Sequence, residues 1–412
     1  MNFSEFGFDP KILKAVAKEG YTQPTPIQAQ AFPILLNEHD LLGSAQTGTG
    51  KTAAFALPII QLLLEQNDRR KSIKALVVTP TRELAIQIAD NFKKYASFTG
   101  LRTAVIFGGV KQGSQVTELN KGVDILIATP GRLLDLVGQR IVDLRWLKFF
   151  VLDEADQMLD MGFIHDIKRI IRIIPQKRQS LFFSATMPTN IIELSKEILG
   201  NYKRVSVAPE KPAAERVSQV VYRVAKADKP KLLIHLLNEE YYYTTLVFSR
   251  TKHGADKIVR KLKQANIKAE AIHGNKSQNA RQRTLKAFKE GKTPVLVATD
   301  IAARGIDVSD LSLVVNYDLP NVAETYVHRI GRTGRAKASG VSISFCDDME
   351  LKDLWDIEKL LNKKIDRVED QPYHLEGNTP VDRPAPGQGR RNQQNKTQKR
   401  HNKGNRRNPR RR

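Results

Sequence analysis

The sequence predicts an α/β protein with two domains in series, each a buried parallel sheet flanked by helices, followed by a disordered basic C-terminal tail. Short apolar segments alternate with amphipathic ones through most of the 412 residues. A chain of this length forms two or three domains. Beyond about residue 369 it fills with Gly, Pro, Gln, Asn and Arg, a composition that cannot bury enough apolar surface to fold alone.

The expected strands are short runs rich in Val, Ile, Leu or Phe. They follow a first strand-like stretch at 40–44 and lie at 75–78, 124–128, 149–152, 180–183, 245–248, 269–272, 294–298 and 313–316. Two prolines and several small or charged residues predict a linker at 206–218. We therefore place the first domain at 1–205, the second at 219–368 with a final helix around 348–362, and the tail at 369–412.

The composition excludes several classes of protein. A single cysteine, Cys346, excludes an intramolecular disulfide and a cysteine-rich zinc site, and it fits a cytoplasmic location. The first residues lack the features of a signal peptide, and the most apolar run, Ala53–Leu64, is too short to span a bilayer, so no membrane partner is expected.

The net charge of +23 indicates a polyanionic partner, with nucleic acid as the first expectation. Residues 383–412 hold 12 Lys or Arg and no Asp or Glu, which is about half of the excess. We expect this tail to tether RNA without sequence preference, and a purely solubilising tail is the alternative. Composition alone does not separate RNA from DNA, a ribosome or an anionic membrane.

A glycine-rich segment, AQTGTGKT, follows the first strand and precedes a helix-like run. It approximates a phosphate-binding loop, formed by Ala45, Gln46, Thr47, Gly48, Thr49, Gly50, Lys51 and Thr52. Gly48 and Gly50 let backbone N–H groups approach phosphates. Lys51 would reach the β- and γ-phosphates, and the Thr52 hydroxyl would bind Mg²⁺. An ordinary glycine-rich turn is the alternative.

Two adjacent carboxylates, Asp153 and Glu154, follow an apolar strand about a hundred residues later. Neighbouring side chains at a strand end point in different directions. Asp153 can therefore serve Mg²⁺ while Glu154 positions and deprotonates the attacking water. A solvated acidic turn is the alternative. Together with the loop, this pair predicts hydrolysis of a nucleoside triphosphate.

The segment Tyr21–Gln28 is a candidate reader of the base. The Gln28 amide can both donate to and accept from the N6 and N7 edge of adenine, and Tyr21 could stack on the ring. A proline-fixed helix start with an incidental glutamine explains the same residues more simply.

A basic segment near the end of the second domain contains His328, Arg329, Arg332 and Arg335. Arg332 and Arg335 are three residues apart, which can place them on one face of a helix. Guanidinium groups on the γ-phosphate would stabilise the charge that develops during its transfer. An exposed basic helix that binds nucleic acid directly is the alternative.

Taken together, these motifs resemble the DEAD-box ATP-dependent RNA helicases, for which Asp153–Asp156 is the name-giving tetrapeptide. The resemblance covers about residues 3–360, and Ala45 at the first position of the loop is usual in that family. The opening segment and the helical end after Arg335 look most like the bacterial RhlE-like subgroup. The resemblance implies two RecA-like domains, ATP and Mg²⁺ as cofactors, and RNA-stimulated ATP hydrolysis coupled to local, non-processive unwinding and remodelling of RNA–protein complexes.

The resemblance also assigns roles to individual residues. It implies adenine contacts by Phe3, Tyr21, Thr25 and Gln28, a ribose contact by Asp307, and arginine fingers at Arg332 and Arg335. The residues that it places on RNA are Pro80, Thr81, Arg82, Gly108, Gly109, Thr129, Pro130, Gly131, Arg132, Arg250, Gln278, Arg281, Thr299 and Gly305. Those that it assigns to coupling hydrolysis with strand separation are Asp156, Ser184, Ala185 and Thr186.

His328 could act as a catalytic base, but the resemblance favours a hydrogen bond toward Asp156 and the segment Ser184–Thr186. The phosphate-binding groups lie in the first domain and the arginines in the second, so hydrolysis is expected to require closure of the two. A DNA-dependent motor and a non-catalytic RNA chaperone remain as rival functions. Contact mainly with the RNA backbone implies little sequence preference, and ribosomes or the RNA-decay machinery are compatible partners.

Overall fold

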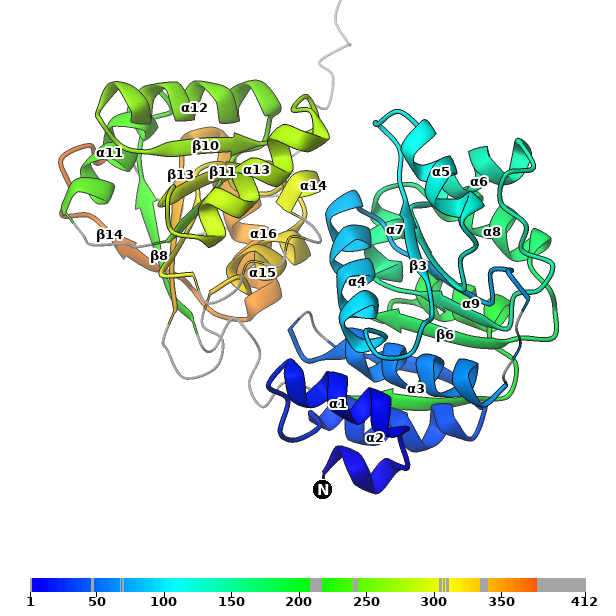
Figure 1. Ribbon diagram of the computed structural model, residues 1–412. Helices are drawn as coiled ribbons and strands as arrows, with labels where there is room; N and C mark the ends of the chain where they lie inside the picture. The colour runs from blue at the N-terminus through cyan, green and yellow to red at the C-terminus, as the bar shows by residue number, and fades with distance from the viewer. Residues whose placement is uncertain are drawn as a thin grey trace, which may run out of the picture. The chain divides into compact units, whose positions relative to one another are not determined.

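The structure is a computed structural model that describes residues 2–45, 48–66, 68, 70–207, 217–239, 244–303, 306, 308, 311–333 and 340–375. It contains two seven-stranded sheets in which all strands pair in parallel, with helices packed on them (Figure 1). The predicted α/β fold is confirmed. The predicted tail beyond residue 375 and most of the predicted linker lie outside the described residues.

The first sheet has the strand order β3-β4-β2-β5-β6-β1-β7. Its strands are β1 Asp40–Ser44, β2 Ala75–Val78, β3 Thr103–Ile106, β4 Ile125–Ala128, β5 Phe149–Leu152, β6 Gln179–Ser184 and β7 Tyr202–Ser206. Every residue of β2, β4, β5 and β6 is buried, which explains their nearly continuous apolar sequences.

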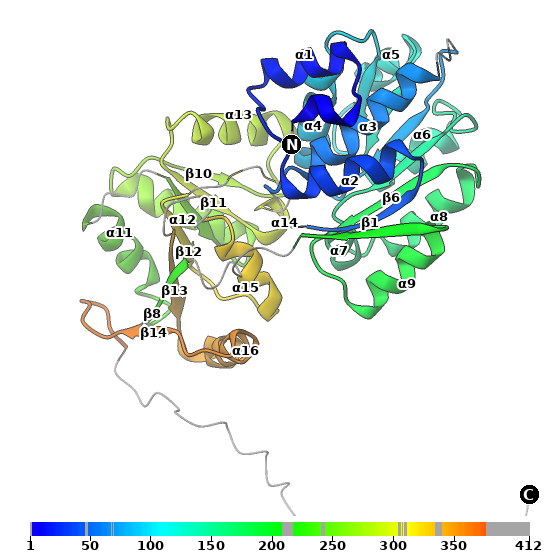
Figure 2. The ribbon, with the colours of Figure 1, turned by 90° about the horizontal axis from the view of Figure 1, so that it is seen from below.

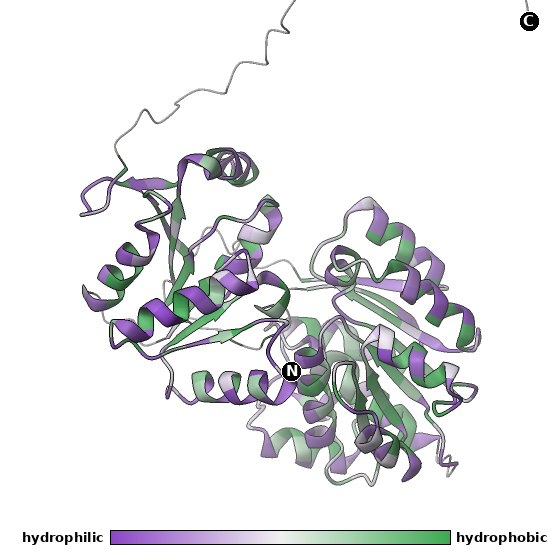
Figure 3. Cartoon of the chain, turned by 90° about the horizontal axis from the view of Figure 1, so that it is seen from above, coloured by the Kyte–Doolittle hydropathy of each residue, from purple (hydrophilic) through white to green (hydrophobic). Residues whose placement is uncertain are grey.

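Helices cover both faces of this sheet (Figure 2). On one face lie η1 Phe3–Phe6, α1 Pro10–Lys18, α2 Pro26–Leu36, α3 Lys51–Glu65 and α4 Arg82–Tyr95, and they share one apolar core cluster. A second cluster joins the other face to α5 Gly113–Asn120, α6 Pro130–Gly138, α7 Ala155–Asp160, α8 Ile164–Ile173 and α9 Thr189–Ile198. The inner strands are correspondingly coloured as hydrophobic in Figure 3, whereas the helices carry both colours.

The second sheet repeats this topology, with the order β10-β11-β9-β12-β13-β8-β14. Its strands are β8 Val217–Arg223, β9 Thr245–Phe248, β10 Ala269–Ile272, β11 Val295–Ala298, β12 Leu313–Asn316, β13 Gly340–Cys346 and β14 Asp366–Val368. Its helices are α11 Lys229–Glu239, α12 Lys252–Gln264, α13 Gln278–Lys289, α14 Asp300–Ala303, α15 Ala323–Ile330, η2 Asp348–Glu350 and α16 Leu351–Leu361. Each strand of the first sheet thus has a counterpart seven strands later.

The core clusters of the two sheets do not share residues. Two clusters hold buried residues from Phe3 to Val205, and three hold residues from Val217 to Ile365. Each sheet with its helices therefore has its own hydrophobic core and meets the physical requirement for folding alone.

Strands flank the predicted linker at 206–218 on both sides. Ser206 ends β7, and Val217 and Ser218 begin β8, so the flanks of the predicted linker are strands. After α16, β14 pairs with β8, and Gln371 Nε2 donates to the Arg223 carbonyl at 2.9 Å. The helix predicted around 348–362 is confirmed as η2 and α16, but β14 follows it, so the helix is not the last element of the domain. A three-residue polar strand has no hydrophobic periodicity by which the sequence could predict it.

The predicted functional motifs follow the carboxyl ends of the parallel strands, where ligands bind in sheets of this type.

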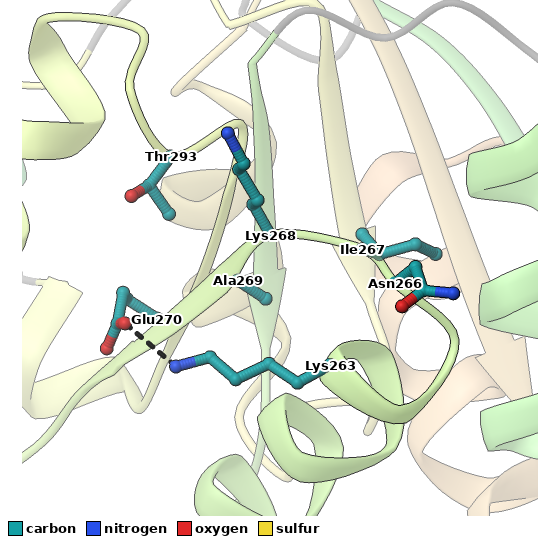
Figure 4. A pocket seen from close by; sticks show the side chains of 7 residues that line it. All are labelled: Lys263, Asn266, Ile267, Lys268, Ala269, Glu270 and Thr293. Atoms are coloured by element: carbon teal, nitrogen blue, oxygen red, sulfur yellow. Dashed lines mark hydrogen bonds and ion pairs between the residues drawn. The ribbon is translucent and has the colours of Figure 1, made fainter.

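A cavity of about 400 Å³ lies away from these motifs, beside the first residue of the edge strand β10. Lys263 forms an ion pair with Glu270 across it at 2.8 Å (Figure 4). Charged side chains at an exposed edge strand prevent pairing with other strands. Among the described residues, no helix is long and apolar enough to cross a membrane.

Candidate nucleotide and RNA sites

The phosphate-binding loop connects β1 to α3. Gly50 caps α3 with φ at 91°, and a Cβ added there would lie 2.5 Å from Gln28 Nε2. Lys51 begins the helix and is buried, and its Nζ lies 3.9 Å from Asp153 Oδ1. Within the described residues no hydrogen-bond acceptor reaches this Nζ. A buried ammonium group requires one, and a phosphate oxygen fits. Gln46 and Thr47 lie outside the described residues.

The two carboxylates follow β5 and are both buried to 3% exposure. Asp153 Oδ1 accepts from the Glu154 N–H at 3.0 Å. Burial raises the pKa of Asp153, and the charge of Lys51 opposes this rise. Burial also raises the pKa of Glu154 to about 7, opposed by Lys51 and Arg332 and assisted by Asp153. A carboxylate with a pKa near 7 is suited to accept a proton.

Asp153 and Glu154 form the turn between β5 and α7, and their backbone conformations differ. Glu154 has a left-handed backbone, with φ at 57°, which is unusual for a residue other than glycine. Strained conformations of this kind concentrate at functional sites. The backbone geometry therefore supports different roles for Asp153 and Glu154, as the sequence predicts.

The residues present fit a triphosphate with Mg²⁺. Two buried carboxylates ionise side by side only when cations face them, and Lys51 supplies a single positive charge. Thr52 lies half-buried in the first turn of α3. No group of three or more His, Cys, Asp or Glu in the described part of the chain could hold a metal ion by itself. Mg²⁺ bound through one or two protein groups, phosphates and water needs no such group.

Gln28 connects the candidate base-binding segment to the phosphate loop. Its Oε1 accepts from the Thr25 N–H at 3.0 Å, and its Nε2 donates to the Gly50 carbonyl at 3.1 Å. Tyr21 is 39% exposed, whereas Phe3 is buried with its ring 6.1 Å from that of Phe32. Of the two aromatic residues predicted at the base, Tyr21 is thus the accessible one.

Asp156 binds the loop after β6. Its Oδ2 accepts from the Ala185 N–H at 3.1 Å, the Thr186 N–H at 2.9 Å and the Thr186 hydroxyl at 3.0 Å. The Ser184 hydroxyl donates to the Thr186 carbonyl at 2.7 Å. These hydrogen bonds connect the acidic motif directly to Ser184–Thr186, the segment predicted to couple hydrolysis to RNA.

His328 lines a cavity of about 390 Å³ together with residues of the acidic motif and of the loop after β6. Asp156 and Thr186 line it from the first domain, and Thr325 and His328 of α15 line it from the second. Both domains belong to the single unit Met1–His374. This arrangement is the one that a linking role for His328 requires.

Arg332 is buried, and its Nη1 donates to the Ile306 carbonyl at 2.9 Å. Its positive charge opposes the rise in the pKa of Glu154 that burial causes. The helix α15 ends at Ile330, so the expectation that Arg332 lies on a helical face is wrong: the residue lies in the turn that follows. Arg335, Asp307 and Gly305 lie outside the described residues.

Three loops of the first domain converge on one surface. Thr81 caps α4 by accepting from the Leu84 N–H at 3.3 Å, and Arg82 begins that helix. The Arg82 guanidinium packs so closely on Gly109, which has φ at 75°, that a Cβ there would come within 2.2 Å of it. From the first turn of α6, Arg132 Nη2 donates to the Val110 carbonyl at 3.1 Å. The other predicted RNA contacts of this domain lie in the same places: Pro80 and Gly108 in the loops, Thr129 at the N-cap of α6, and Pro130 and Gly131 in its first turn.

The predicted RNA contacts of the second domain have protein partners. Gln278 Nε2 and Arg281 Nη2 donate to the two carboxylate oxygens of Glu83, each at 2.8 Å. Arg250 Nη2 donates to the Leu319 carbonyl at 2.8 Å and to Glu350 and Asp353, each at 3.2 Å. The Thr299 carbonyl accepts the first backbone hydrogen bonds of α14. Sequence reasoning missed Glu83, although it follows Arg82 directly in the same motif.

Replacing Gly50 by alanine is expected to weaken nucleotide binding at least about tenfold, equivalent to 1.4 kcal/mol. The added Cβ would displace Gln28 and strain a backbone with φ at 91°. Gly162→Ala is the matched control, because Gly162 has φ at 80° and nothing within 4 Å of the added Cβ. Titration with a fluorescent ATP analogue measures both. Equal affinities in the two variants would contradict this role of Gly50.

The chain was compared with known protein families. The model of the DEAD/DEAH box helicases matches residues 25–194, and that of the helicase conserved C-terminal domain matches residues 228–337. DEAD-box ATP-dependent RNA helicase 14 of Arabidopsis thaliana is 42% identical over 90% of this chain, and the match spans 60% of that relative. ATP-dependent RNA helicase CshA of Listeria monocytogenes is 41% identical over 88% of this chain and 69% of its own length.

Solved structures are similar to both domains together. Dbp5 of S. cerevisiae bound to RNA and ADP BeF3 has a TM-score of 0.78 and 32% identity, covering 89% of this chain and 95% of that one. Mss116 bound to ssRNA and AMP-PNP has a TM-score of 0.80 and 31% identity, covering 90% and 79%. By its two matched domains and its similarity to these relatives, the chain belongs to the DEAD-box helicase family.

Proposed function

We propose that this protein is an ATP-dependent RNA helicase that hydrolyses ATP to ADP and phosphate when RNA is bound, and uses the cycle to open short duplexes locally. The observation that carries this proposal is the buried Lys51 ammonium, which lies 3.9 Å from Asp153 Oδ1 and has no hydrogen-bond acceptor among the described residues. Glu154, buried beside Asp153, supplies the second carboxylate of the site. Relatives named as ATP-dependent RNA helicases support it.

In this proposal the first domain binds ATP and activates water. Backbone N–H groups of the glycine-rich loop and Lys51 Nζ hold the phosphates, and Gln28 and Tyr21 face the base. Mg²⁺, when bound through Thr52 and Asp153, supplies neutralisation of the phosphate charge. Glu154 accepts the proton of the water whose oxygen attacks the γ-phosphorus, and the bond to the ADP oxygen breaks.

The second domain completes the site. Arg332 donates to the γ-phosphate oxygens as negative charge develops, and Arg335 is proposed to act beside it. After hydrolysis, Asp156 would transmit the change to Ser184–Thr186 through its three hydrogen bonds, and His328, which lines the same cavity, would move away from them. Domain opening would then release RNA.

RNA is proposed to lie on the loops that carry Arg82, Gly109 and Arg132, with the second domain adding the turns after β9 and β11. Contacts to phosphates and sugars position a strand without reading its sequence.

The unwinding is proposed to be non-processive. A cytoplasmic location, membership of the RhlE-like subgroup, and partners in ribosome assembly or RNA decay are further proposals, consistent with bacterial relatives such as RhpA of Helicobacter pylori.

ATP hydrolysis measured with RNA and with DNA of matched sequence tests this proposal. RNA is expected to stimulate turnover, whereas DNA leaves it near the rate without nucleic acid, because contacts to the 2′-hydroxyl separate the two. Equal stimulation by DNA would favour a DNA-dependent motor instead. RNA binding and annealing without ATP turnover would favour a non-catalytic chaperone.

A further inference from the structure

The helix α16 presents an aromatic and basic face that no step of the proposed cycle uses. Its inner face buries Leu354 and Ile357 in a core cluster beside α15, and Figures 1 and 2 both show these two helices side by side. On the outer side Lys352, Trp355 and Lys359 are exposed. Their spacing of three and four residues places them on one side of the helix. We call these three residues the Trp355 face.

Large apolar side chains are unusually exposed here. Trp355 is 41% exposed, and it lies between Met349 at 89% and Leu360 at 45%. The Lys359 ammonium lies 5.3 Å from the centre of the Trp355 ring. An exposed aromatic side chain flanked by cations is the combination with which proteins bind single-stranded nucleic acid, because a base stacks on the ring while the cations meet its phosphates.

Exposed lysines lie on both sides of Trp355 along the chain. Lys363 and Lys364 follow the helix and are exposed. Three acidic groups of the same stretch have basic partners: Glu350 with Lys229 at 2.5 Å, Asp353 with Arg250 at 3.2 Å, and Glu358 with Arg367 at 2.7 Å. Asp356 of α16 is half-buried, and the exposed acidic residues Asp366, Glu369 and Asp370 follow the lysines. The exposed lysines on either side of Trp355, rather than a net positive charge of the stretch, are therefore the groups that phosphates would meet.

The face also adjoins the proposed RNA path. Asp353 of α16 accepts from Arg250, which directly follows β9, and Glu350 at the start of α16 accepts from the same guanidinium. The turn after β9 is one of the proposed RNA contacts of the second domain. We therefore expect a strand that leaves this turn to be able to continue along α16.

We propose that the Trp355 face is an additional binding site for single-stranded RNA, at which one base stacks on Trp355 and the neighbouring phosphates bind Lys352, Lys359, Lys363 and Lys364. The inference rests on the proposed function, because it extends the RNA surface of the helicase core. It adds affinity for the strand that emerges from the second domain, and it is independent of base identity because every base offers a ring face.

The chain provides an internal probe, because it contains two tryptophans. Trp146 in the first domain is 47% exposed, and the Arg70 guanidinium lies 4.2 Å from its ring, so it matches Trp355 in exposure and in its cationic neighbour. The full chain with Trp146→Phe emits from Trp355, and the full chain with Trp355→Phe emits from Trp146. An oligouridylate of about ten nucleotides is added to each in the presence of a non-hydrolysable ATP analogue.

We expect the oligouridylate to quench the emission of Trp355 and to leave that of Trp146 unchanged. The analogue without RNA should quench neither, which separates base stacking from domain closure. Trp355→Ala is expected to weaken binding of a fluorescein-labelled oligouridylate about five- to thirtyfold, as loss of one stacked base does, and Trp146→Ala should bind like the unchanged protein. Trp355→Phe, which retains an aromatic ring, should restore most of the affinity.

Two results would overturn the inference, and they are distinguishable. If the oligouridylate binds but Trp355 emission and the affinity of Trp355→Ala are unchanged, the face does not bind RNA, and a protein partner becomes the better explanation of its exposure. If the unchanged protein does not bind the oligouridylate at all, the proposed function itself fails.

Discussion

Replacing Glu154 by glutamine should slow RNA-stimulated ATP hydrolysis by about 10²–10⁴-fold, the range for loss of a general base. Glutamine has the same shape but cannot accept the proton of the attacking water. In the structure Glu154 is buried beside Lys51 and Asp153, and its pKa near 7 suits it to this proton transfer. Binding of ATP and RNA should persist, because neither Lys51 nor the RNA-binding loops are changed.

Turnover is measured with saturating ATP and RNA, and binding is measured with labelled RNA in the same preparation. Glu118→Gln is the matched control, since Glu118 is exposed on α5 and pairs with Lys121. It should hydrolyse ATP at the rate of the unchanged protein. A Glu154→Gln variant that does the same would remove Glu154 from the mechanism.

Arg332→Ala should lower the hydrolysis rate by about 10³–10⁵-fold, the range for loss of an arginine finger. Arg332 belongs to the second domain, yet its charge acts on Glu154 in the first, and its hydrogen bond to the Ile306 carbonyl fixes the direction of the guanidinium. Arg332→Lys should rescue only part of the rate, because an ammonium group cannot donate in the same forked geometry.

Single-turnover hydrolysis of radiolabelled ATP isolates this effect from product release. Arg260→Ala, at an exposed position of α12, removes an arginine from the same domain and serves as the control. If Arg332→Ala retained more than about a tenth of the rate, far above the expected range, the charge of Arg332 would have no part in phosphoryl transfer.

The sequence predicted the inner strands well because both faces of these sheets are covered. The runs at 75–78, 149–152 and 245–248 are buried at every residue, so their apolar composition is a direct consequence of their position. Five strands, β3, β7, β8, β13 and β14, are absent from the predicted runs. β7 and β14 are short edge strands with exposed, charged residues, and in β8 and β13 polar residues interrupt the apolar ones. An edge strand is defined by backbone pairing with a neighbour, which composition does not record.

The site was predictable where one motif holds all the chemistry, and less so where partners come from distant segments. Lys51 and Asp153 carry local signals, a glycine-rich loop and an acidic pair at a strand end. The pairing of Glu83 with Gln278 and Arg281 joins residues about two hundred positions apart. The same applies to Arg250, because its partners Glu350 and Asp353 lie about a hundred positions away in the sequence.

Hydrolysis by the isolated first domain tests the central claim, that ATP is cleaved only when the second domain completes the pocket. Residues 2–207 contain two core clusters of their own and should fold without the rest of the chain. They should bind ATP through Lys51 and Gln28 but hydrolyse it at least about 10³-fold more slowly than the full chain with saturating RNA, since Arg332 is missing. An isolated first domain that folds and hydrolyses ATP as fast as the full chain would contradict the account.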